Sequence, residues 1–222
     1  MCGRFTLYQL GNALAQIFHV EKLPELEPKY NIAPTQMVTT VLYNSATKKR
    51  ELQQLRWGLI PSWAKDPRMG VKLINARAET VTEKPAFRSA FKHRRCLIVA
   101  DGFYEWQQQG SKKQPFYFRL LEEKPFGFAG LWEQWKSPEG DQISSCTILT
   151  TEANQLVQPI HDRMPVILQP EDYDTWLDPQ LQTPERLQPL LHPYSSEKMT
   201  AYPVSTLVNS PKHNHPECVK PM

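Results

Sequence analysis

The fold class is decided by one segment rich in strand-forming residues, residues 96–121, with the sequence CLIVADGFYEWQQQGSKKQPFYFRLL. β-Branched and aromatic residues concentrate in three runs within it, 96–100, 103–109 and 115–121, and such residues favour strands. The polar stretch 110–113 separates the last two runs and predicts a tight turn. The segment therefore predicts consecutive antiparallel strands.

Short strands and helices continue in both directions from this segment. Further strands are predicted at 37–43, 51–57, 126–132, 143–150 and 199–204. Helices are predicted at 6–20, 83–95, 171–177 and 184–191. Many short antiparallel strands with peripheral helices are typical of the α+β class. Because the 222 residues contain no visible linker or repeat, we expect one domain over residues 1–222.

The cysteines and the hydropathy pattern indicate a reducing compartment. No apolar run is long enough to cross a membrane, and the start of the sequence lacks a secretory signal. The four cysteines, Cys2, Cys96, Cys146 and Cys218, form no CxxC pair, so we expect free thiols. The expected location is cytoplasmic, nucleoid-associated if the protein is bacterial, with no membrane contact.

Positive charge is concentrated in one part of the chain. Residues 65–95 hold nine Lys and Arg against three Asp and Glu, whereas the net charge of the whole chain is +3. Two explanations stay open, a surface for a polyanion or an ordinary solvated surface. Trp57 and Trp63 lie close to this segment, and aromatic rings beside positive charge are typical of sites for unpaired bases. Core packing explains Trp57 equally well.

The amino terminus carries the most distinctive chemical group. Removal of Met1 would give Cys2 a free α-amine beside its thiol, which is a 1,2-aminothiol. The amine can condense with an aldehyde to an imine, and the thiol can then close a five-membered thiazolidine ring. The ordinary alternative is a cysteine that has no role at this position.

Three other stretches place polar side chains in ordered sequence. Glu105 lies in a strand-like run, where burial would raise the pKa of its carboxyl group and let it shuttle a proton. His161 stands between apolar sequence and an Asp-Arg pair, before a predicted strand. Asn75, Arg77 and Glu79 alternate, so on an extended chain they face one side. The structural alternatives are an exposed Glu, a structural His, and a polar strand face that pairs with itself or its neighbours.

No metal or cofactor is expected. His213, His215 and Cys218 lie close in sequence, but no second ligand pair at a zinc-site spacing accompanies them. The sequence also lacks a glycine-rich phosphate loop. Cys96 and Cys146 lie in apolar strands, as inert core thiols do.

Six motifs in a fixed order resemble the SRAP family, the SOS response-associated peptidase-like or abasic site processing proteins. They are Met1-Cys2-Gly3-Arg4-Phe5, Tyr30-Asn31-Ile32-Ala33-Pro34, Arg56-Trp57-Gly58, Ile74-Asn75-Ala76-Arg77, Asp101-Gly102-Phe103-Tyr104-Glu105-Trp106 and Ile160-His161-Asp162-Arg163-Met164-Pro165. The resemblance implies a mainly antiparallel, bifurcated and partly barrel-like sheet flanked by short helices. It also implies a positively charged groove for single-stranded DNA.

The resemblance implies a function as well as a fold. The expected protein is a covalent sensor of abasic sites in single-stranded DNA, forming a thiazolidine crosslink, with lyase or crosslink-reversal activity in DNA repair. The catalytic residues that the resemblance implies are Cys2, Asn75, Glu105 and His161. The DNA contacts expected beside them are Arg4, Pro34, Trp63, Arg77 and Arg163. A link to the replication machinery and a monomeric state belong to the same expectation.

Two other functions use the same residues. A cysteine peptidase would use Cys2 as nucleophile, His161 as base and Glu105 as orienting group, with the Met1-Cys2 bond as its own substrate. A non-covalent single-strand-binding module would need only the basic segment and the tryptophans. Acetylation of the α-amine separates the peptidase from thiazolidine formation. Treatment of the DNA complex with denaturant separates the binding module from the covalent sensor, because only a covalent product survives it.

Overall fold

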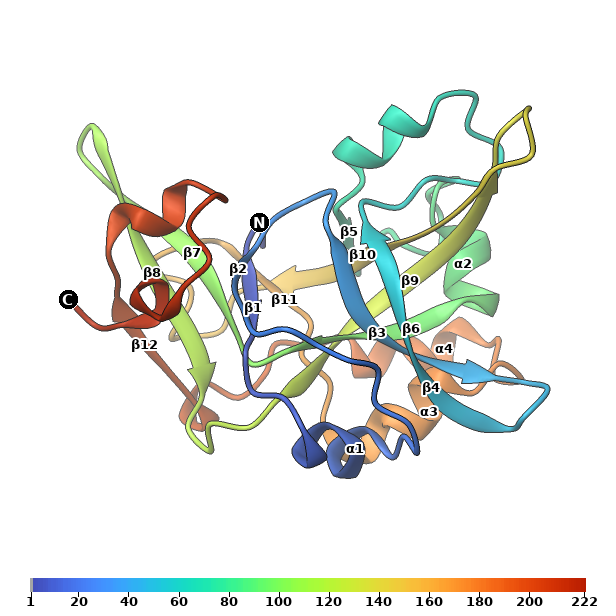
Figure 1. The fold of residues 1–222 in the computed structure, drawn as a ribbon, viewed down its shortest axis with the longest axis horizontal. Coiled ribbons are helices and arrows are strands. Elements are labelled where there is room, and N and C mark those ends of the chain that lie inside the picture. The colour runs from blue at the N-terminus through green and yellow to red at the C-terminus, as the bar shows by residue number, and fades with distance from the viewer. Residues whose placement is uncertain (1) are drawn as a thin grey trace.

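Two β-sheets stand side by side around a shared hydrophobic core (Figure 1). The computed structural model describes residues 2–222. The strands are β1 (Phe5–Leu7), β2 (Lys29–Ile32), β3 (Met37–Asn44), β4 (Lys49–Trp57), β5 (Asn75–Arg77), β6 (Arg95–Ala100), β7 (Gly102–Gln109), β8 (Lys112–Leu120), β9 (Phe126–Lys136), β10 (Gln142–Glu152), β11 (Arg163–Pro165) and β12 (Met199–Pro203). The α-helices are α1 (Asn12–Phe18), α2 (Arg88–His93), α3 (Tyr173–Leu177) and α4 (Pro184–Leu187). Short 3-10 turns lie at Pro67–Lys72, Pro170–Asp172, Gln188–Leu190, Ser196–Lys198, Thr206–Asn209 and Pro216–Val219.

The first sheet carries the start of the chain. Its strands follow the order β12-β8-β7-β1-β2, and all neighbours are antiparallel. β1 pairs with β7 so that Phe5 lies opposite Phe103. Buried hydrogen bonds fix this pairing, because the Asp101 carboxylate accepts from the Thr6 hydroxyl and, at 2.6 Å, from the Tyr8 N–H. The strand that follows the amino terminus is therefore anchored at its far end.

The second sheet closes into a small barrel. β4 pairs with β3, β3 with β6, β6 with β9, β9 with β10, and β10 again with β4. β5 and β11 extend the sheet by pairing with the later half of β10. The α+β class and the bifurcated, partly barrel-like sheet expected from the sequence are both confirmed.

Most strands lie where the sequence predicted them. The stretches 37–43 and 51–57 form the antiparallel hairpin β3–β4. The turn predicted at 110–113 joins β7 to β8 but is shorter, because Lys112 and Lys113 already pair with β7 and only residues 110 and 111 form the turn. Gly110 in that turn has a φ of 59°, a left-handed conformation that glycine adopts without steric cost. The turn residue and the flanking strand patterns therefore agree.

The helix predicted at 6–20 is wrong in its first half. Phe5–Leu7 is strand β1, and α1 occupies only Asn12–Phe18. Leu14 and Phe18 face the core, as the helical spacing indicated. The apolar spacing before Gly11 fits a helix and a strand equally well, and pairing with β7, which is distant in sequence, decides between them.

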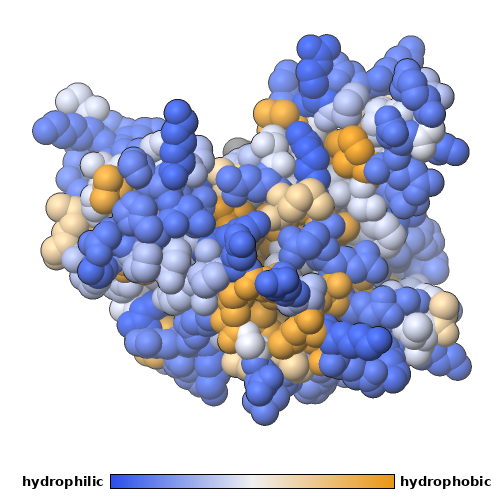
Figure 2. Space-filling view, in the orientation of Figure 1, coloured by the Kyte–Doolittle hydropathy of each residue, from blue (hydrophilic) through white to orange (hydrophobic). Residues whose placement is uncertain are grey.

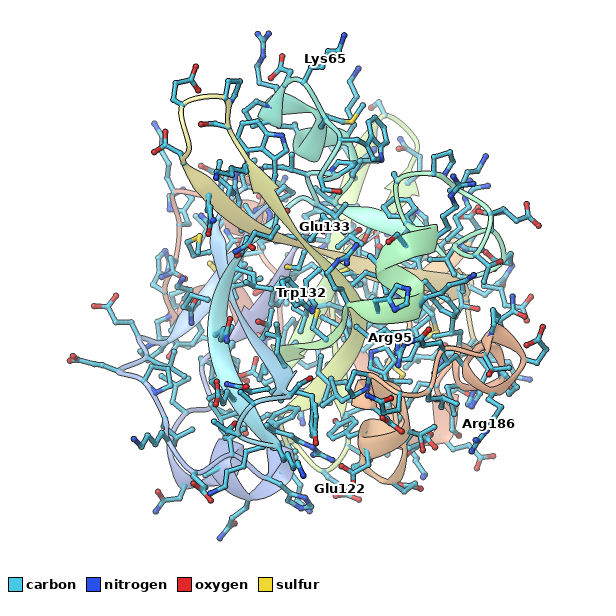
Figure 3. The ribbon with its side chains drawn as sticks, turned by 90° about the vertical axis from the view of Figure 1, so that its right-hand side faces the viewer. Lys65, Arg95, Glu122, Trp132, Glu133 and Arg186 are labelled. Atoms are coloured by element: carbon cyan, nitrogen blue, oxygen red, sulfur yellow. The ribbon has the colours of Figure 1, made fainter. Side chains whose placement is uncertain are left out.

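The basic helix predicted at 83–95 is also shorter than expected. Only α2, Arg88–His93, is α-helical, and the basic residues of 65–95 are not all on the surface. Lys65 projects at the tip of the segment that joins β4 to β5, whereas Arg95 lies below α2 with 5% of its surface exposed (Figure 3). The Asp66 carboxylate pairs with Arg68. The positive charge is therefore divided between separate parts of the molecule.

Arg95 joins the helices to the barrel. The N–H groups of its guanidinium donate to five main-chain carbonyl oxygens, those of Phe91, Lys92, Trp176, Asp178 and Leu181. The first two lie in the last turn of α2, and Trp176 lies in the last turn of α3. One buried cation thus satisfies carbonyl groups that a helix end leaves unpaired. No helix among residues 2–222 is long and apolar enough to span a membrane.

Candidate active site

Cys2 lies ahead of β1, where the two sheets meet. Nδ2 of Asn75, on β5, donates to the Cys2 carbonyl oxygen at 2.8 Å, so the second sheet touches the start of the first. The Cys2 side chain is fully buried. Burial raises the pKa of its thiol, and the nearby charge of Glu105 raises that pKa further. The thiol is therefore protonated, and so neutral, near neutral pH. Met1, whose removal the sequence analysis expects, lies outside the described residues.

Asn75 is held in place by strand pairing. β5 runs parallel to β10, with Asn75 opposite Ile148. While Nδ2 of Asn75 bonds to Cys2, its Oδ1 atom is buried without a hydrogen-bond partner among residues 2–222. Leaving such an acceptor unpaired costs about 1–3 kcal/mol. This oxygen is therefore suited to accept a hydrogen bond from a hydroxyl or amine group brought to the site.

Glu105 enters the same region from β7. Its side chain is 3% exposed, and burial raises the pKa of its carboxyl group to about 7. The Asp162 charge contributes to the same shift. A carboxyl group with this pKa is present in both protonation states near neutral pH, so it can both donate and accept a proton.

His161 follows a tight loop that Asn154 shapes. The Asn154 side-chain oxygen accepts from the Val157 N–H, and the His161 N–H donates to the Val157 carbonyl oxygen. Nδ1 of His161 accepts the Arg163 N–H at 2.9 Å and lies 2.9 Å from the Asp162 carboxylate. Burial lowers the pKa of the ring. A neutral ring that accepts at Nδ1 carries its proton on Nε2, whereas protonation of Nδ1 would make Asp162 its acceptor.

Glu105 and His161 open onto one cleft of about 440 Å³. Its lining consists of Arg4, Glu105, Trp106, Lys113, His161 and Asn209. Figure 2 shows the surface hollowed between the β7–β8 hairpin and residues 58–74, the segment that joins β4 to β5. The Cys2 side chain is fully buried and not exposed to this cleft. Reaction at its thiol therefore requires a change that exposes the side chain to the cleft.

Arg4 brings positive charge to the cleft. Its Nη1 donates to Asn31 Oδ1 and to the Val208 carbonyl oxygen, both at 2.7 Å. Its guanidinium carbon lies 5.9 Å from the centre of the Trp106 ring. None of the ion pairs within residues 2–222 involves Arg4. A cation without a carboxylate partner beside an open cleft is suited to bind a phosphate group.

The other expected DNA contacts lie outside the lining of this cleft. Pro34 is half-buried in the turn between β2 and β3, Trp63 is 56% exposed on residues 58–74, and Arg77 is exposed at the end of β5. Both Nη atoms of Arg163 bond to the Glu79 carboxylate. Glu79 therefore pairs with Arg163 rather than with Arg77, and a phosphate at Arg163 would compete with the Glu79 carboxylate for its Nη atoms.

The sequence analysis misses four residues around Arg4 and the cleft. Asn31 holds Arg4, whereas Trp106, Lys113 and Asn209 form part of the cleft wall. The Trp106 indole N–H donates to Asn209 Oδ1 at 2.7 Å. Asn31 and Trp106 lie within two of the six motifs, which is the signal that could have found them. Asn209 and Lys113 reach the cleft only through the tertiary fold.

His213, His215 and Cys218 are not arranged as a metal site. Within residues 2–222, no group of three or more His, Cys, Asp or Glu side chains is arranged to hold a metal ion. The rings of His213 and His215 meet edge to face, with centres 5.8 Å apart. All four cysteines are free and buried, including Cys96 and Cys146 in the barrel core.

Known proteins resemble this chain over nearly its whole length. The model of the SOS response associated peptidase (SRAP) family matches residues 1–211. Abasic site processing protein YoqW of Bacillus subtilis is 49% identical over 224 residues, covering 99% of each chain. Abasic site processing protein HMCES of Xenopus tropicalis is 37% identical over 223 residues, covering 87% of this chain and 66% of that protein.

Solved structures share the fold. A crystal structure of a protein from Bacteroides thetaiotaomicron superposes with a TM-score of 0.88 at 28% identity, covering all of both chains. A crystal structure of a protein from Bordetella bronchiseptica superposes with a TM-score of 0.79 at 26% identity, covering 92% of this chain and all of the other.

Proposed function

The chain belongs to the SOS response associated peptidase (SRAP) family, and from this membership and the site geometry we propose that it senses abasic sites in single-stranded DNA by bonding to them through Cys2. One arrangement carries the proposal. Asn75 donates a hydrogen bond to the Cys2 carbonyl oxygen, and the Glu105 charge helps to raise the pKa of the Cys2 thiol. Arg4 and Glu105 line the same cleft. A proton carrier and a phosphate-binding cation thus share one cleft, and Asn75 holds the nucleophile.

The proposed reaction begins after Met1 is removed. The α-amine of Cys2 attacks the aldehyde carbon of the opened abasic sugar, and loss of water gives an imine. The Cys2 sulfur then bonds to the imine carbon, and the thiol proton passes to the nitrogen. The product is a thiazolidine that joins protein and DNA, with one water released overall.

Glu105 is the proposed proton carrier. An abasic sugar is mostly a closed ring, and opening it needs a proton at the ring oxygen. Because burial raises the pKa of Glu105 to about 7, the group can deliver that proton and later accept one. The unpaired Oδ1 of Asn75 is positioned to accept from a sugar hydroxyl or from the new linkage.

Lyase activity and crosslink reversal branch from the same intermediate. The imine acidifies the neighbouring sugar carbon, so a base that removes a proton there expels the 3′ phosphate. His161 and Glu105 both open onto the cleft where that base would act. We assign His161 to acid–base chemistry near the lesion, with Arg77 and Arg163 as phosphate contacts and Pro34 and Trp63 as groove-lining groups.

The buried thiol favours this route over a cysteine peptidase. A peptidase needs a thiolate, and burial raises the pKa of the Cys2 thiol. Thiazolidine formation begins at the amine and does not need a thiolate. We further propose that residues 1–222 act as one monomeric domain in the cytoplasm, on strands exposed by replication.

The test is a denaturing gel with two controls. Protein is incubated with single-stranded DNA containing one abasic site or one tetrahydrofuran analogue, which cannot open to an aldehyde. A second sample is acetylated at its α-amine first. We expect a denaturation-resistant complex with the abasic site alone, and none after acetylation. A complex that forms with acetylated protein would contradict the mechanism.

A further inference from the structure

Arg4 lies in a cradle built from three distant parts of the chain. Its Nη1 bonds to Asn31 on β2 and to Val208 in the 3-10 turn near the carboxyl terminus. The Trp106 ring on β7 lies beneath the guanidinium. These bonds use both N–H groups of Nη1. Nη2 has no hydrogen bond within residues 2–222, so it is available to a ligand in the cleft.

Asn31 is the centre of that cradle. Its side chain is 2% exposed. Its Oδ1 accepts from Arg4, and its Nδ2 faces the carbonyl oxygens of Val208, Ser210 and His213 at 3.2, 3.0 and 2.7 Å. One amide therefore ties the arginine to the segment that follows residue 205. Every polar atom of this amide is engaged, so its orientation is fixed.

We propose that Asn31 is a positioning residue for DNA binding, which holds Arg4 and the carboxyl-terminal segment together so that the free edge of the guanidinium faces a phosphate in the cleft. The proposal rests on the proposed function, because it takes the ligand of Arg4 to be a DNA phosphate. Asn31 itself does not touch the DNA.

The physical reason is the flexibility of arginine. A free arginine side chain loses conformational entropy when a ligand fixes it. Here the hydrogen bonds to Asn31 and Val208 fix it before binding, so less entropy is lost on contact. Loss of the Asn31 amide would release both Arg4 and the segment that carries the Val208 carbonyl group.

The test measures DNA affinity and its salt dependence. The variants are Arg4→Ala, Asn31→Ala and the double variant, each with single-stranded DNA that contains no abasic site. We expect each single variant to bind about tenfold more weakly, and each to lower the slope of log affinity against log salt by about one. Because Asn31 acts through Arg4, the double variant should bind no more weakly than Arg4→Ala.

Two controls separate positioning from general damage. Asn44→Ala removes another asparagine that makes several hydrogen bonds, in the β3–β4 turn, and should keep wild-type affinity and slope. Asn31→Ser removes both sets of contacts, because its hydroxyl is too short to reach Arg4 or the carboxyl-terminal carbonyls, but it keeps a polar group that can bond to water in the space left. It therefore tests the proposal if Asn31→Ala does not fold. Asn31→Ser should match Arg4→Ala.

The outcomes distinguish this proposal from the proposed function. Additive losses in the double variant, or wild-type affinity and slope in Asn31→Ser, would overturn the positioning role while wild-type protein still forms its crosslink. Failure of wild-type protein to bind single-stranded DNA or to form the crosslink would instead overturn the function on which the proposal rests.

Discussion

Two arginines, Arg4 and Arg95, show how the same side chain serves two regions differently. Both donate to main-chain carbonyl oxygens, and within residues 2–222 neither forms an ion pair with a carboxylate. Arg95 is 5% exposed, and its N–H groups are fully used. Arg4 borders a cleft of about 440 Å³, and its Nη2 atom has no hydrogen-bond partner within residues 2–222.

The difference teaches that burial of a charged group does not by itself mark a functional site. All five N–H groups of Arg95 meet an acceptor, so this side chain has no hydrogen-bonding capacity left for a ligand. Around Arg4 and Cys2, by contrast, Arg4 Nη2 and Asn75 Oδ1 have no hydrogen-bond partner within residues 2–222. Unused capacity beside an opening is what separates the candidate site from the structural region.

The largest effect is expected at Cys2. Cys2→Ala should abolish the covalent DNA adduct that survives denaturation. Without the thiol no thiazolidine can form, and the imine that the amine still forms is hydrolysed. Cys96→Ala is the matched control, since both cysteines are fully buried. Each variant should lower the free energy of unfolding by about 1 kcal/mol. An adduct from Cys2→Ala that survives denaturation would show that Cys2 is not the bonding residue, and so would contradict the contrast between a reactive Cys2 and a structural Cys96.

The next effect is expected at Arg95. Arg95→Met leaves five carbonyl groups without their donor, so urea unfolding should show a loss of about 3–5 kcal/mol. Arg4→Met leaves only two acceptors without their donor and should cost less, about 1–2 kcal/mol. Adduct formation per folded molecule should be unchanged in Arg95→Met. Equal loss of stability in both variants would contradict the contrast drawn between them.

A smaller effect on rate is expected at Glu105. Glu105→Gln should slow adduct formation by about 100-fold near pH 6, because a positioned acid contributes at least that much. Since burial raises the pKa of Glu105 to about 7, the wild type loses its acid as the pH rises through 7. The ratio of the two rates should therefore shrink between pH 6 and 9. A constant ratio would exclude Glu105 as the acid.

Glu105→Gln should slow the reaction but, relative to pH 4, make the protein more stable than the wild type at high pH. The pKa of Glu105 is raised from 4.5 when unfolded to about 7 when folded, so wild-type stability falls as the pH rises from 4.5 to 7. Glu105→Gln removes this loss. Relative to its value at pH 4, the free energy of unfolding of the variant should exceed that of the wild type by about 3 kcal/mol at pH 8. Denaturation at both pH values measures the difference.

The smallest effect is expected at Trp63. Trp63→Ala should weaken single-strand binding about fivefold, because one base loses a stacking partner. Leu121→Ala is the control, since both side chains are 56% exposed and Leu121 lies in the turn after β8. Neither variant should change stability. Equal affinity of the two variants in fluorescence titration would remove Trp63 from the DNA-binding groove.

Much of the fold could be predicted from local pattern. The β7–β8 hairpin is correct because strand-forming runs flank a turn that contains Gly110. The helix at 6–20 is half wrong because β1 depends on Asp101, which lies far along the chain. Local spacing does not contain that information.

The site divides in the same way. Cys2 and Glu105 carry recognisable chemistry in their own stretches of sequence, and the structure brings them together. Asn31 shows no such chemistry in its sequence, because its importance arises from contacts with residues beyond 205. The charge count of the basic segment 65–95 includes Arg95, whose burial the sequence does not reveal because its partners are main-chain carbonyl groups of α2, α3 and the residues after α3.

The most direct test of the central claim is the intact mass of the product. Purified protein and its Cys2→Ser variant are incubated with single-stranded DNA containing one abasic site, denatured and weighed by mass spectrometry. The account predicts one adduct on protein that lacks Met1, with the summed mass of protein and DNA less one water, and no stable adduct from the variant. Absence of an adduct from wild-type protein with a free amino-terminal cysteine would contradict it.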